Sequence, residues 1–326
     1  MSRKVIVTVP FTAEQQAALA EDAGRYGDRI LFTRGGSASR EEILDADAVI
    51  GNVSPDILSS CGHLSWVQLN SAGAEAYVKE GALPEGTVLT CATGSYGTAI
   101  SEYMVCMLLV MMKKVPLYLE NQKKGVWKDE GPVTTPAGKR ILIVGTGDIG
   151  LSFARRIRAF GLPDRPVRLV GIRRRADACP EPLDEIYPTE KLAEQAALAD
   201  VIAVALPGTA STYHLFDREM LCRCRKGCWL MNVGRGSVVE TEALLDPSVS
   251  GRFSGIYLDV CEKEPLPEND PLFSVPNLYV TPHITGSWHL DVTLENLARL
   301  ARHNYQAWHG EGSFASVVNR ATGYAD

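Results

Sequence analysis

Long apolar runs are missing from this sequence. The longest, Tyr103–Met112, is closed by Glu102 and Lys113, and it is too short to cross a bilayer, which takes about 20 apolar residues. The N-terminal run Lys4–Pro10 lacks the long apolar core and small-residue cleavage site of a signal peptide. We therefore expect a cytoplasmic protein without a membrane partner.

An excess of positive charge is also absent. The chain has 33 Lys and Arg residues against 39 Asp and Glu residues, which gives a formal net charge of -6. Proteins that bind duplex nucleic acid usually present a basic face that neutralises phosphates, so we expect no nucleic-acid partner. A length of 326 residues with 45% hydrophobic content is ordinary for a globular protein with two cores.

Cysteines are present but follow no metal-binding pattern. Most of the eight lie singly in apolar stretches, where cysteine is a small core residue. Cys222, Cys224 and Cys228 are the exception, and a zinc site is the alternative interpretation. Their spacing contains no CxxC pair, and no histidine follows at ligand spacing. We expect no metal site, and a helix end followed by a turn.

Short apolar runs alternate with helix-like segments along the chain, without internal repeats. This alternation predicts parallel sheets covered by helices. We expect an α/β protein with two doubly wound parallel-sheet domains, one Rossmann-type and one flavodoxin-like. The Rossmann-type domain is predicted at residues 99–288. The flavodoxin-like domain is predicted to be discontinuous, at residues 1–98 and 289–326, because a last helix at about Leu290–Trp308 is expected to return to it.

One predicted helix, Ala99–Lys114, is apolar nearly all round, which is typical of a helix buried between layers or domains. The following segment, Pro116–Lys139, breaks the pattern. A solvent-exposed arm and a subunit contact are both consistent with its composition.

A glycine motif begins the second half of the chain. The β-branched run Ile141–Val144 leads directly into Gly145, Gly147 and Gly150, and an amphipathic helix follows. The first glycine permits a tight turn, the second a close approach to a pyrophosphate, and the third close packing of helix on strand. The N–H groups of the helix N-terminus then face the phosphates. The predicted cradle consists of Gly145, Gly147, Asp148, Ile149 and Gly150.

The next predicted strand lacks the acidic residue that would bind the ribose 2′-hydroxyl of NAD. Arg173, Arg174 and Arg175 stand there instead. Guanidinium groups clamp a 2′-phosphate, which a carboxylate would repel. The sequence therefore favours NADP(H), bound by Arg173 and Arg174, and leaves NAD(H) possible. The alternative interpretation is a solvated basic turn.

Three polar residues follow on separate segments: Arg235 in Asn232–Gly236, Glu264 before Pro265, and His283 after Pro282. Taken singly, each is typical of an ordinary loop. A cation, a carboxylate and an imidazole after a dinucleotide motif are, however, the groups that a dehydrogenase of 2-hydroxy or 2-keto acids needs. Their joint occurrence indicates a hydride-transfer site.

At this point the chain resembles the D-isomer-specific 2-hydroxyacid dehydrogenase family. The similarity extends over nearly the whole chain and is weakest in the first sixty residues. It is carried by the segments Ser71–Gly73, Ile100–Glu102, Gly125–Trp127, Gly145–Gly150, Leu206–Pro207, Asn232–Gly236, Leu258–Val260, Glu264–Leu266 and Thr281–His283.

The resemblance implies a role for each reacting group. Arg235 would hold the substrate carboxylate, for which a planar fork of donors is suited. His283 would be the general acid in reduction and the base in oxidation. Glu264 would pair with the imidazole, fix its tautomer and favour its protonated form. A glutamate at 264, instead of glutamine, argues against formate dehydrogenase chemistry.

The resemblance also implies which residues line the cofactor and the substrate. Besides the cradle and the two arginines, the implied cofactor residues are Leu206, Pro207, Thr212, Asn232, Val233, Gly234 and Asp259. Asp259 would lie near the nicotinamide or support the acid–base pair, and structural capping is the alternative. The implied substrate residues are Ser71, Ala72, Gly73 and Trp288, together with Arg235 and His283.

We therefore predict an NAD(P)-dependent oxidoreductase that reduces small 2-keto acids, such as glyoxylate or hydroxypyruvate, to D-2-hydroxy acids. A phosphoglycerate-type dehydrogenase is a second enzymatic interpretation. A non-catalytic, NAD(P)-sensing corepressor-like protein is a third. A homodimer is expected from the resemblance alone.

Overall fold

The computed structural model describes residues 2–33 and 38–325, so residues 1, 34–37 and 326 of the predicted flavodoxin-like domain lie outside it. The chain divides into two compact units. The first comprises Met1–Tyr96 and Trp288–Asp326, and the second comprises Gly97–Ser287.

The first unit is built on a five-stranded parallel sheet in the order β2-β1-β3-β4-β5. This is the order of a flavodoxin-like sheet. The strands are β1 (Lys4–Val7), β2 (Arg29–Phe32), β3 (Ala48–Ile50), β4 (Trp66–Gln68) and β5 (Val88–Thr90). Its other elements are α1 (Ala13–Tyr26), α2 (Arg40–Leu44), α3 (Pro55–Leu58), α11 (Asp291–Trp308) and the ribbon of β13 (Val318–Asn319) and β14 (Tyr324–Ala325).

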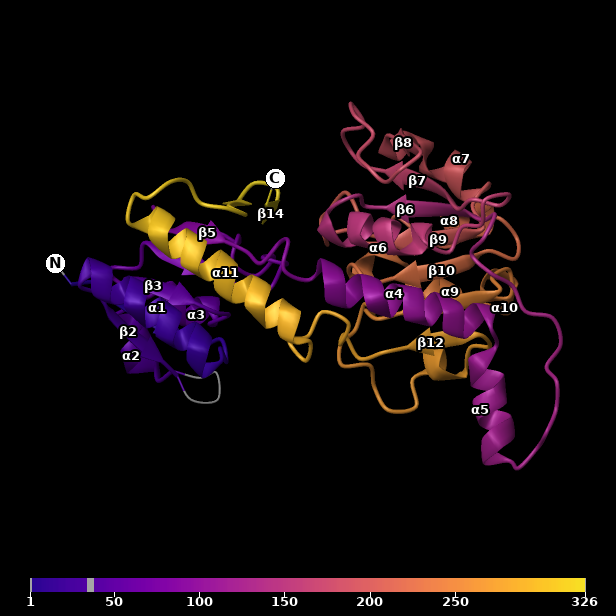
Figure 1. The fold of residues 1–326 in the computed structure, drawn as a ribbon, viewed down its shortest axis with the longest axis horizontal. Coiled ribbons are helices and arrows are strands. Elements are labelled where there is room, and N and C mark those ends of the chain that lie inside the picture. The colour runs from indigo at the N-terminus through magenta and orange to yellow at the C-terminus, as the bar shows by residue number, and fades with distance from the viewer. Residues whose placement is uncertain (1, 34–37, 326) are drawn as a thin grey trace. The chain divides into compact units, whose positions relative to one another are not determined.

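The last long helix belongs to this first unit. α11 packs against α1 (Figure 1). Arg302 of α11 donates from Nε to the Oδ2 atom of Asp22 in α1, over 2.7 Å, and that carboxylate is buried. The chain therefore returns to its first sheet after completing the second.

The second unit contains a seven-stranded parallel sheet in the order β12-β11-β10-β9-β6-β7-β8 (Figure 1). The strands are β6 (Arg140–Val144), β7 (Arg168–Ile172), β8 (Glu185–Tyr187), β9 (Val201–Val204), β10 (Trp229–Asn232), β11 (Gly255–Leu258) and β12 (Leu278–Val280). The chain runs outward from β6 to β8 and then returns to β9 on the other side of β6. This reversal is the topological switch point of a Rossmann sheet, where ligands bind. The predicted fold class is confirmed.

The helices of the second unit are α4 (Gly97–Met112), α5 (Val115–Lys123), α6 (Asp148–Arg158), α7 (Leu192–Ala196), α8 (Arg218–Arg223), α9 (Thr241–Leu244) and α10 (Pro247–Ser250). α4 packs against α6 and β11, as expected of its apolar surface. In the residues that the structure describes, no helix is long and apolar enough to span a membrane.

The segment after α4 begins with a helix that the sequence analysis did not predict. Its first part is the helix α5, in which Pro116 lies in the first turn. A proline is tolerated there because the first N–H groups of a helix have no intrahelical acceptor. The proline therefore begins a new helix, and Lys114, with a φ of 56°, turns the chain between the two.

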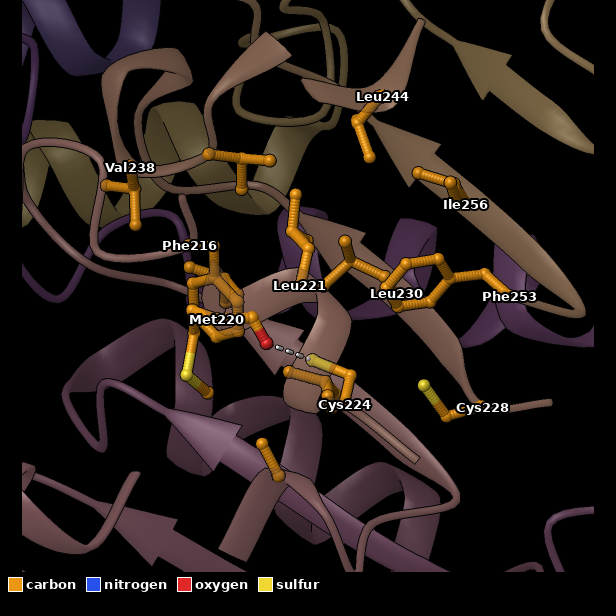
Figure 2. Packing of buried hydrophobic residues seen from close by; sticks show 14 of the residues in the cluster. Phe216, Met220, Leu221, Cys224, Cys228, Leu230, Val238, Leu244, Phe253 and Ile256 are labelled. Atoms are coloured by element: carbon orange, nitrogen blue, oxygen red, sulfur yellow. Dashed lines mark hydrogen bonds between the residues drawn. The ribbon is translucent and has the colours of Figure 1, made fainter. Parts of the chain in front are cut away.

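The core of the second unit contains two of the three clustered cysteines (Figure 2). Cys224 and Cys228 are buried among apolar side chains such as Phe253, and Cys224 donates from Sγ to the carbonyl oxygen of Met220. Burial raises the pKa of both thiols. Cys222 is exposed. The pair acts as small core residues.

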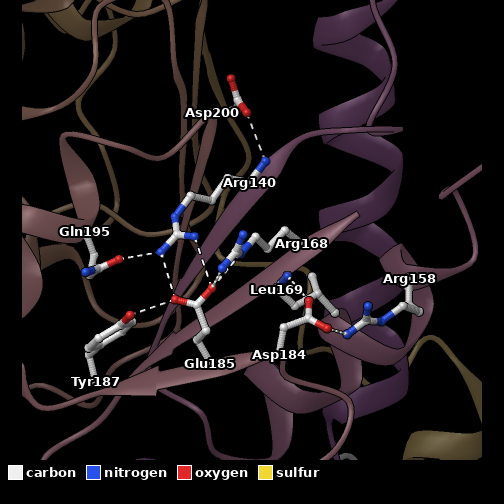
Figure 3. Close-up of polar contacts among 9 residues, drawn as sticks. All are labelled: Arg140, Arg158, Arg168, Leu169, Asp184, Glu185, Tyr187, Gln195 and Asp200. Atoms are coloured by element: carbon white, nitrogen blue, oxygen red, sulfur yellow. Dashed lines mark hydrogen bonds and ion pairs between the residues drawn. The ribbon is translucent and has the colours of Figure 1, made fainter. Parts of the chain in front are cut away.

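A polar network joins the amino ends of β6, β7 and β8 (Figure 3). The carboxylate of Glu185 accepts hydrogen bonds from both terminal nitrogens of Arg140, from Arg168 and from the hydroxyl of Tyr187. Burial alone would raise the pKa of Glu185, but these hydrogen bonds outweigh it and lower the pKa to about 2. The ionised carboxylate therefore stabilises the edge of the sheet.

Replacing Glu185 by Gln is expected to lower the free energy of unfolding at neutral pH by about 2 kcal/mol, after discounting for partial exposure. Because the pKa is lowered in the folded state, this contribution is complete above the ordinary carboxyl pKa of 4.5 and is lost as the pH falls towards about 2. Urea unfolding at neutral pH and at about pH 3 measures it. The control is Glu194→Gln, which removes an exposed ion pair with Lys191. A Glu185 effect no larger than the control would contradict the prediction.

Candidate functional site

Five loops of the second unit begin side by side at the carboxyl edge of its sheet. The register pairs Val144 with Val204, Val204 with Asn232, Asn232 with Leu258, and Leu258 with Val280. The next residues along the chain are Gly145, Ala205, Val233, Asp259 and Thr281, so these start their loops in one row. These loops contain Gly145 and Gly147 of the predicted cradle, Arg235, Glu264 and His283, and the rest of the cradle begins α6.

The three positions of the cradle are glycine for different physical reasons. A Cβ at Gly145, which has a φ of +100°, would lie 2.5 Å from the carbonyl oxygen of Ala205, and one at Gly150 would lie 2.1 Å from that of Gly145. A Cβ at Gly147 would meet nothing within 4 Å. Gly147 is the N-cap of α6, so a side chain there would extend into the space before the helix N-terminus. That space fits a pyrophosphate held by backbone N–H groups.

The side chain of Asp148 has another function. A Cβ at Gly97, the first residue of α4, would lie 2.5 Å from both Asp148 Oδ1 and Ser152 Oγ, so the carboxyl packs against the start of α4. Burial raises the pKa of Asp148 more than the hydrogen bond from the backbone of Gly97 lowers it. The carboxyl of Asp148 therefore serves the packing of α4 on α6, and its backbone remains for the cradle.

Arg173 and Arg174 directly follow β7, which pairs with β6, and both are exposed. The backbone N–H of Arg173 donates to the carbonyl oxygen of Tyr187, over 3.1 Å. The two side chains thus extend from the strand next to the one that leads into Gly145.

Hydrogen bonds within the β9 and β10 loops shape the surroundings of Arg235. The amide of Asn232 is fully buried; it donates to the carbonyl oxygen of Arg235 and accepts from the N–H of Gly234. The hydroxyl of Thr212 donates to the carbonyl oxygen of Pro207, over 2.7 Å. These two polar side chains therefore hold their own loops. Val233 and Gly234 are buried beside them, and Leu206 and Pro207 are half-buried.

The Arg235 side chain is half-buried and lies against the β9 loop. A Cβ at Gly208 would lie 3.2 Å from Arg235 Cγ, and Arg235 Nη1 donates to the carbonyl oxygen of Gly234, over 2.9 Å. The stem is thereby packed, as a guanidinium used for recognition requires.

The imidazole of His283 and the carboxylate of Glu264 form a pair. Nδ1 of His283 lies 2.7 Å from Oε2 of Glu264. The other carboxylate oxygen accepts from the backbone N–H of Cys261, over 2.9 Å, which fixes the orientation of Glu264. The imidazole is about half exposed. With Nδ1 engaged by a carboxylate, the arrangement leaves Nε2 to exchange a proton with a ligand.

Asp259 holds the loop that carries His283. Its buried carboxylate accepts from the hydroxyls of Thr281 and Thr285 and from the N–H groups of Ile284 and Thr285. Its carbonyl oxygen accepts from the N–H of His283, over 2.9 Å. The Asp259 side chain therefore holds the loop that contains the histidine. The two threonines were not identified from the sequence.

The remaining predicted substrate residues lie in the first unit. Ser71 lies in a bend after β4, and its hydroxyl donates to the carbonyl oxygen of Gly73, over 2.7 Å. Ala72 lies between them. Trp288 is the first residue of the returning segment and is exposed.

Comparisons with known proteins agree with this geometry. Residues 105–285 match the family model described as D-isomer specific 2-hydroxyacid dehydrogenase, NAD binding domain. A glyoxylate reductase from Thermofilum pendens is 30% identical over 279 residues, which cover 81% of this chain and 78% of that protein.

Two solved structures share the fold. A D-isomer specific 2-hydroxyacid dehydrogenase family protein from Aeromonas salmonicida is 29% identical, with a TM-score of 0.84 and coverage of 98% of this chain and 100% of that chain. An NADPH-dependent glyoxylate/hydroxypyruvate reductase from Sinorhizobium meliloti, solved with NADP and sulfate, is 24% identical, with a TM-score of 0.81 and coverage of 99% and 100%.

A Rossmann sheet with a glycine cradle and an imidazole–carboxylate pair on neighbouring loops defines a nicotinamide-dependent dehydrogenase. The chain belongs to the D-isomer specific 2-hydroxyacid dehydrogenase family. It is an NAD(P)-dependent oxidoreductase with a small-molecule substrate. The family resemblance and the enzyme class predicted from the sequence are confirmed.

Proposed function

We propose that this enzyme reduces small 2-keto acids of the glyoxylate or hydroxypyruvate type to D-2-hydroxy acids, with NADPH as the preferred reductant. The observation that carries the proposal is the His283–Glu264 pair, whose residues lie on the next two loops after the loop of Arg235 at the carboxyl edge of the sheet. The cradle, Arg235, Glu264 and His283, which the reaction needs, therefore all come from the carboxyl edge of one sheet.

In the proposed reaction, Gly145–Gly150 hold the pyrophosphate of the nucleotide, and Arg173 and Arg174 hold its ribose end. When bound there, the dinucleotide would supply a hydride to the carbonyl carbon of the substrate. Arg235 binds the substrate carboxylate. His283 donates the proton from Nε2 to the carbonyl oxygen as it becomes a hydroxyl. Glu264 stabilises the positive charge on the imidazole before that transfer.

The substrate side of the proposal includes the first unit. We assign the unit to substrate binding, with the backbone N–H groups of Ser71, Ala72 and Gly73 as donors to the carboxylate and Trp288 as a limit on substrate size. The second unit is assigned to the dinucleotide.

Replacing both Arg173 and Arg174 by Ser is expected to lower kcat/KM for NADPH by about 30-fold, because two charge-assisted contacts to the 2′-phosphate are removed. The value for NADH is expected to change less than about threefold. Initial rates with each nucleotide at saturating keto acid measure the ratio. The matched control is Arg155→Ser, which removes an exposed arginine of α6. A wild-type preference for NADH would contradict the cofactor assignment.

Oxidation of NADPH against a panel of 2-keto acids tests the activity as a whole. Turnover of glyoxylate or hydroxypyruvate is the expected result. Turnover confined to a phosphorylated hydroxypyruvate would favour the phosphoglycerate-type alternative. Tight NADPH binding without turnover of any keto acid would favour a nucleotide sensor and would contradict the proposal.

We also propose that the enzyme is a cytoplasmic homodimer. Exposed apolar side chains on α5 and in the segment after it support a subunit contact there. They are Leu117, Leu119, Val126, Trp127 and Val133. Sedimentation of the purified protein tests the oligomeric state.

A further inference from the structure

A second imidazole–carboxylate pair lies in the same unit as the first. Nε2 of His214 is 2.5 Å from Oε1 of Glu262. The imidazole stacks on the ring of Tyr213, with centroids 4.0 Å apart and planes at 15°. His214 and Glu262 are 48 residues apart in the sequence, and both side chains are more than two-thirds buried. This pair has no part in the proposed proton transfer.

Glu262 is an anchored acceptor. Burial raises its pKa, but hydrogen bonds from His214 and from the backbone N–H of Thr241 outweigh that effect, and the pKa of Glu262 is lowered. The N–H of Thr241 donates to Oε2 over 2.7 Å, so both carboxylate oxygens are engaged. An ionised carboxylate only accepts, so Nε2 of His214 donates.

The pair joins three consecutive loops of the carboxyl edge. His214 belongs to the loop after β9, Glu262 to the loop after β11, and Thr241 follows the loop after β10. The N–H of His214 also donates to the carbonyl oxygen of Ser237, over 2.8 Å. Ser237 is two residues beyond Arg235, and Glu262 is two residues before Glu264.

The chain between these loops is packed without spare room. A Cβ at Gly236 would lie 2.0 Å from the carbonyl of Cys261. A Cβ at Gly208 would lie 3.2 Å from the Arg235 side chain. The backbone around Arg235 is thus enclosed between the loop of His214 and the loop of Glu262, and a shift of either loop displaces it.

We propose that His214 and Glu262 are positioning residues for the reduction: their hydrogen bond fixes the β9 and β11 loops on either side of the β10 loop and so holds Arg235 and Glu264 in register for the substrate. This inference rests on the proposed function. Neither residue touches the reacting atoms. Because a misplacement of about 1 Å in such groups costs up to about a hundredfold in rate, the effect is measurable.

His214→Asn is the informative substitution. His214 has a φ of 47°, a region that asparagine tolerates, and the shorter amide does not reach Glu262. We expect kcat/KM for glyoxylate to fall by about 10- to 100-fold, with a rise in KM and a fall in kcat. The Kd for NADPH is expected to rise by less than kcat/KM falls, because the cradle and the two arginines lie on other loops and only the predicted lining residues Leu206, Pro207 and Thr212 share the loop of His214.

Three further variants separate positioning from general stability. Glu262→Ala is expected to match His214→Asn, and Glu262→Gln, which keeps an acceptor, to recover part of the loss. In an Arg235→Lys background, His214→Asn is expected to cost less than about threefold more, because residues acting as one unit are non-additive. The matched control is His309→Gln, which breaks the 2.8 Å contact of His309 Nε2 with Asp28 in the first unit, and whose kcat/KM is expected to equal that of the wild type.

Two outcomes would overturn the inference. The first is a His214→Asn enzyme with a lowered melting temperature and unchanged kcat/KM. The second is a fall in NADPH affinity as large as the fall in kcat/KM, which would place the pair in nucleotide binding. If the wild-type protein reduces no 2-keto acid, the proposed function fails and the positioning role fails with it. If the wild type is active and His214→Asn gives either of the two outcomes above, only the positioning role fails.

Discussion

Replacing His283 by Asn is expected to lower kcat for keto-acid reduction by about a thousandfold, because general acid catalysis contributes about 10²- to 10⁴-fold. Asparagine suits this position for two reasons. His283 has a φ of 50°, which asparagine tolerates, and the amide keeps a donor near Nδ1 for Glu264. The acidic Nε2–H is what the substitution removes.

The measurement is single-turnover oxidation of bound NADPH by saturating glyoxylate, so that product release does not mask the chemical step. The Kd for NADPH is expected to stay within about threefold of the wild type. The matched control is His303→Asn, which alters an exposed histidine of α11 that contacts the carbonyl oxygen of Ser313. A His283 variant with more than about a tenth of the wild-type kcat would refute the role of this imidazole.

Glu264→Gln is a companion variant whose effect is smaller. One oxygen of Glu264 accepts from the N–H of Cys261 and the other contacts His283 Nδ1. An amide keeps only one of these two acceptors, so its NH2 group faces either His283 Nδ1 or the N–H of Cys261, and one of the two hydrogen bonds is lost. A fall in kcat of about 10-fold is expected, below that of the histidine substitution.

The parts of the site that the sequence predicted are those with local signals. The cradle is a strand, three glycines and a helix in one continuous segment, and Gly145 and Gly150 are where the structure forbids a Cβ. The alternation of strands and helices also predicted parallel sheets, because parallel strands need crossover connections. The order of the strands, and with it the row of loops at the carboxyl edge, came from the structure.

The parts of the site and of the fold that the sequence did not predict depend on contacts between residues that are distant in the sequence. Thr285 and Asp259 are 26 residues apart, and nothing near either residue announces their contact. The three-residue strand β8 was missed because its stability comes from pairing with β7 and from the Glu185 network, not from its own pattern. α5 was missed because the apolar pattern stops after α4, although a proline in a first helical turn, such as Pro116, is compatible with a new helix.

Replacing Arg235 by Ala is expected to lower kcat/KM for glyoxylate by about a thousandfold, largely through KM. The substitution removes a charge-assisted, bidentate contact to the carboxylate, and each such hydrogen bond is worth about 2 kcal/mol. The turn itself is expected to survive, because its bonds to Asn232 use backbone atoms of Gly234 and Arg235. Arg235→Lys keeps the charge but loses the planar fork, and it is expected to recover only part of the loss.

A substrate without a carboxylate distinguishes a loss of carboxylate recognition from general damage to the site. Glycolaldehyde has the aldehyde but not the carboxylate of glyoxylate, so its slow reduction is expected to be nearly the same in wild type and Arg235→Ala. The preference for glyoxylate over glycolaldehyde then falls towards unity. The matched control is Arg225→Ala, an arginine that pairs with Asp200 near the amino end of β9. Equal losses of kcat/KM with both aldehydes would show that Arg235 supports the loop without binding the carboxylate. That result would contradict the substrate assignment.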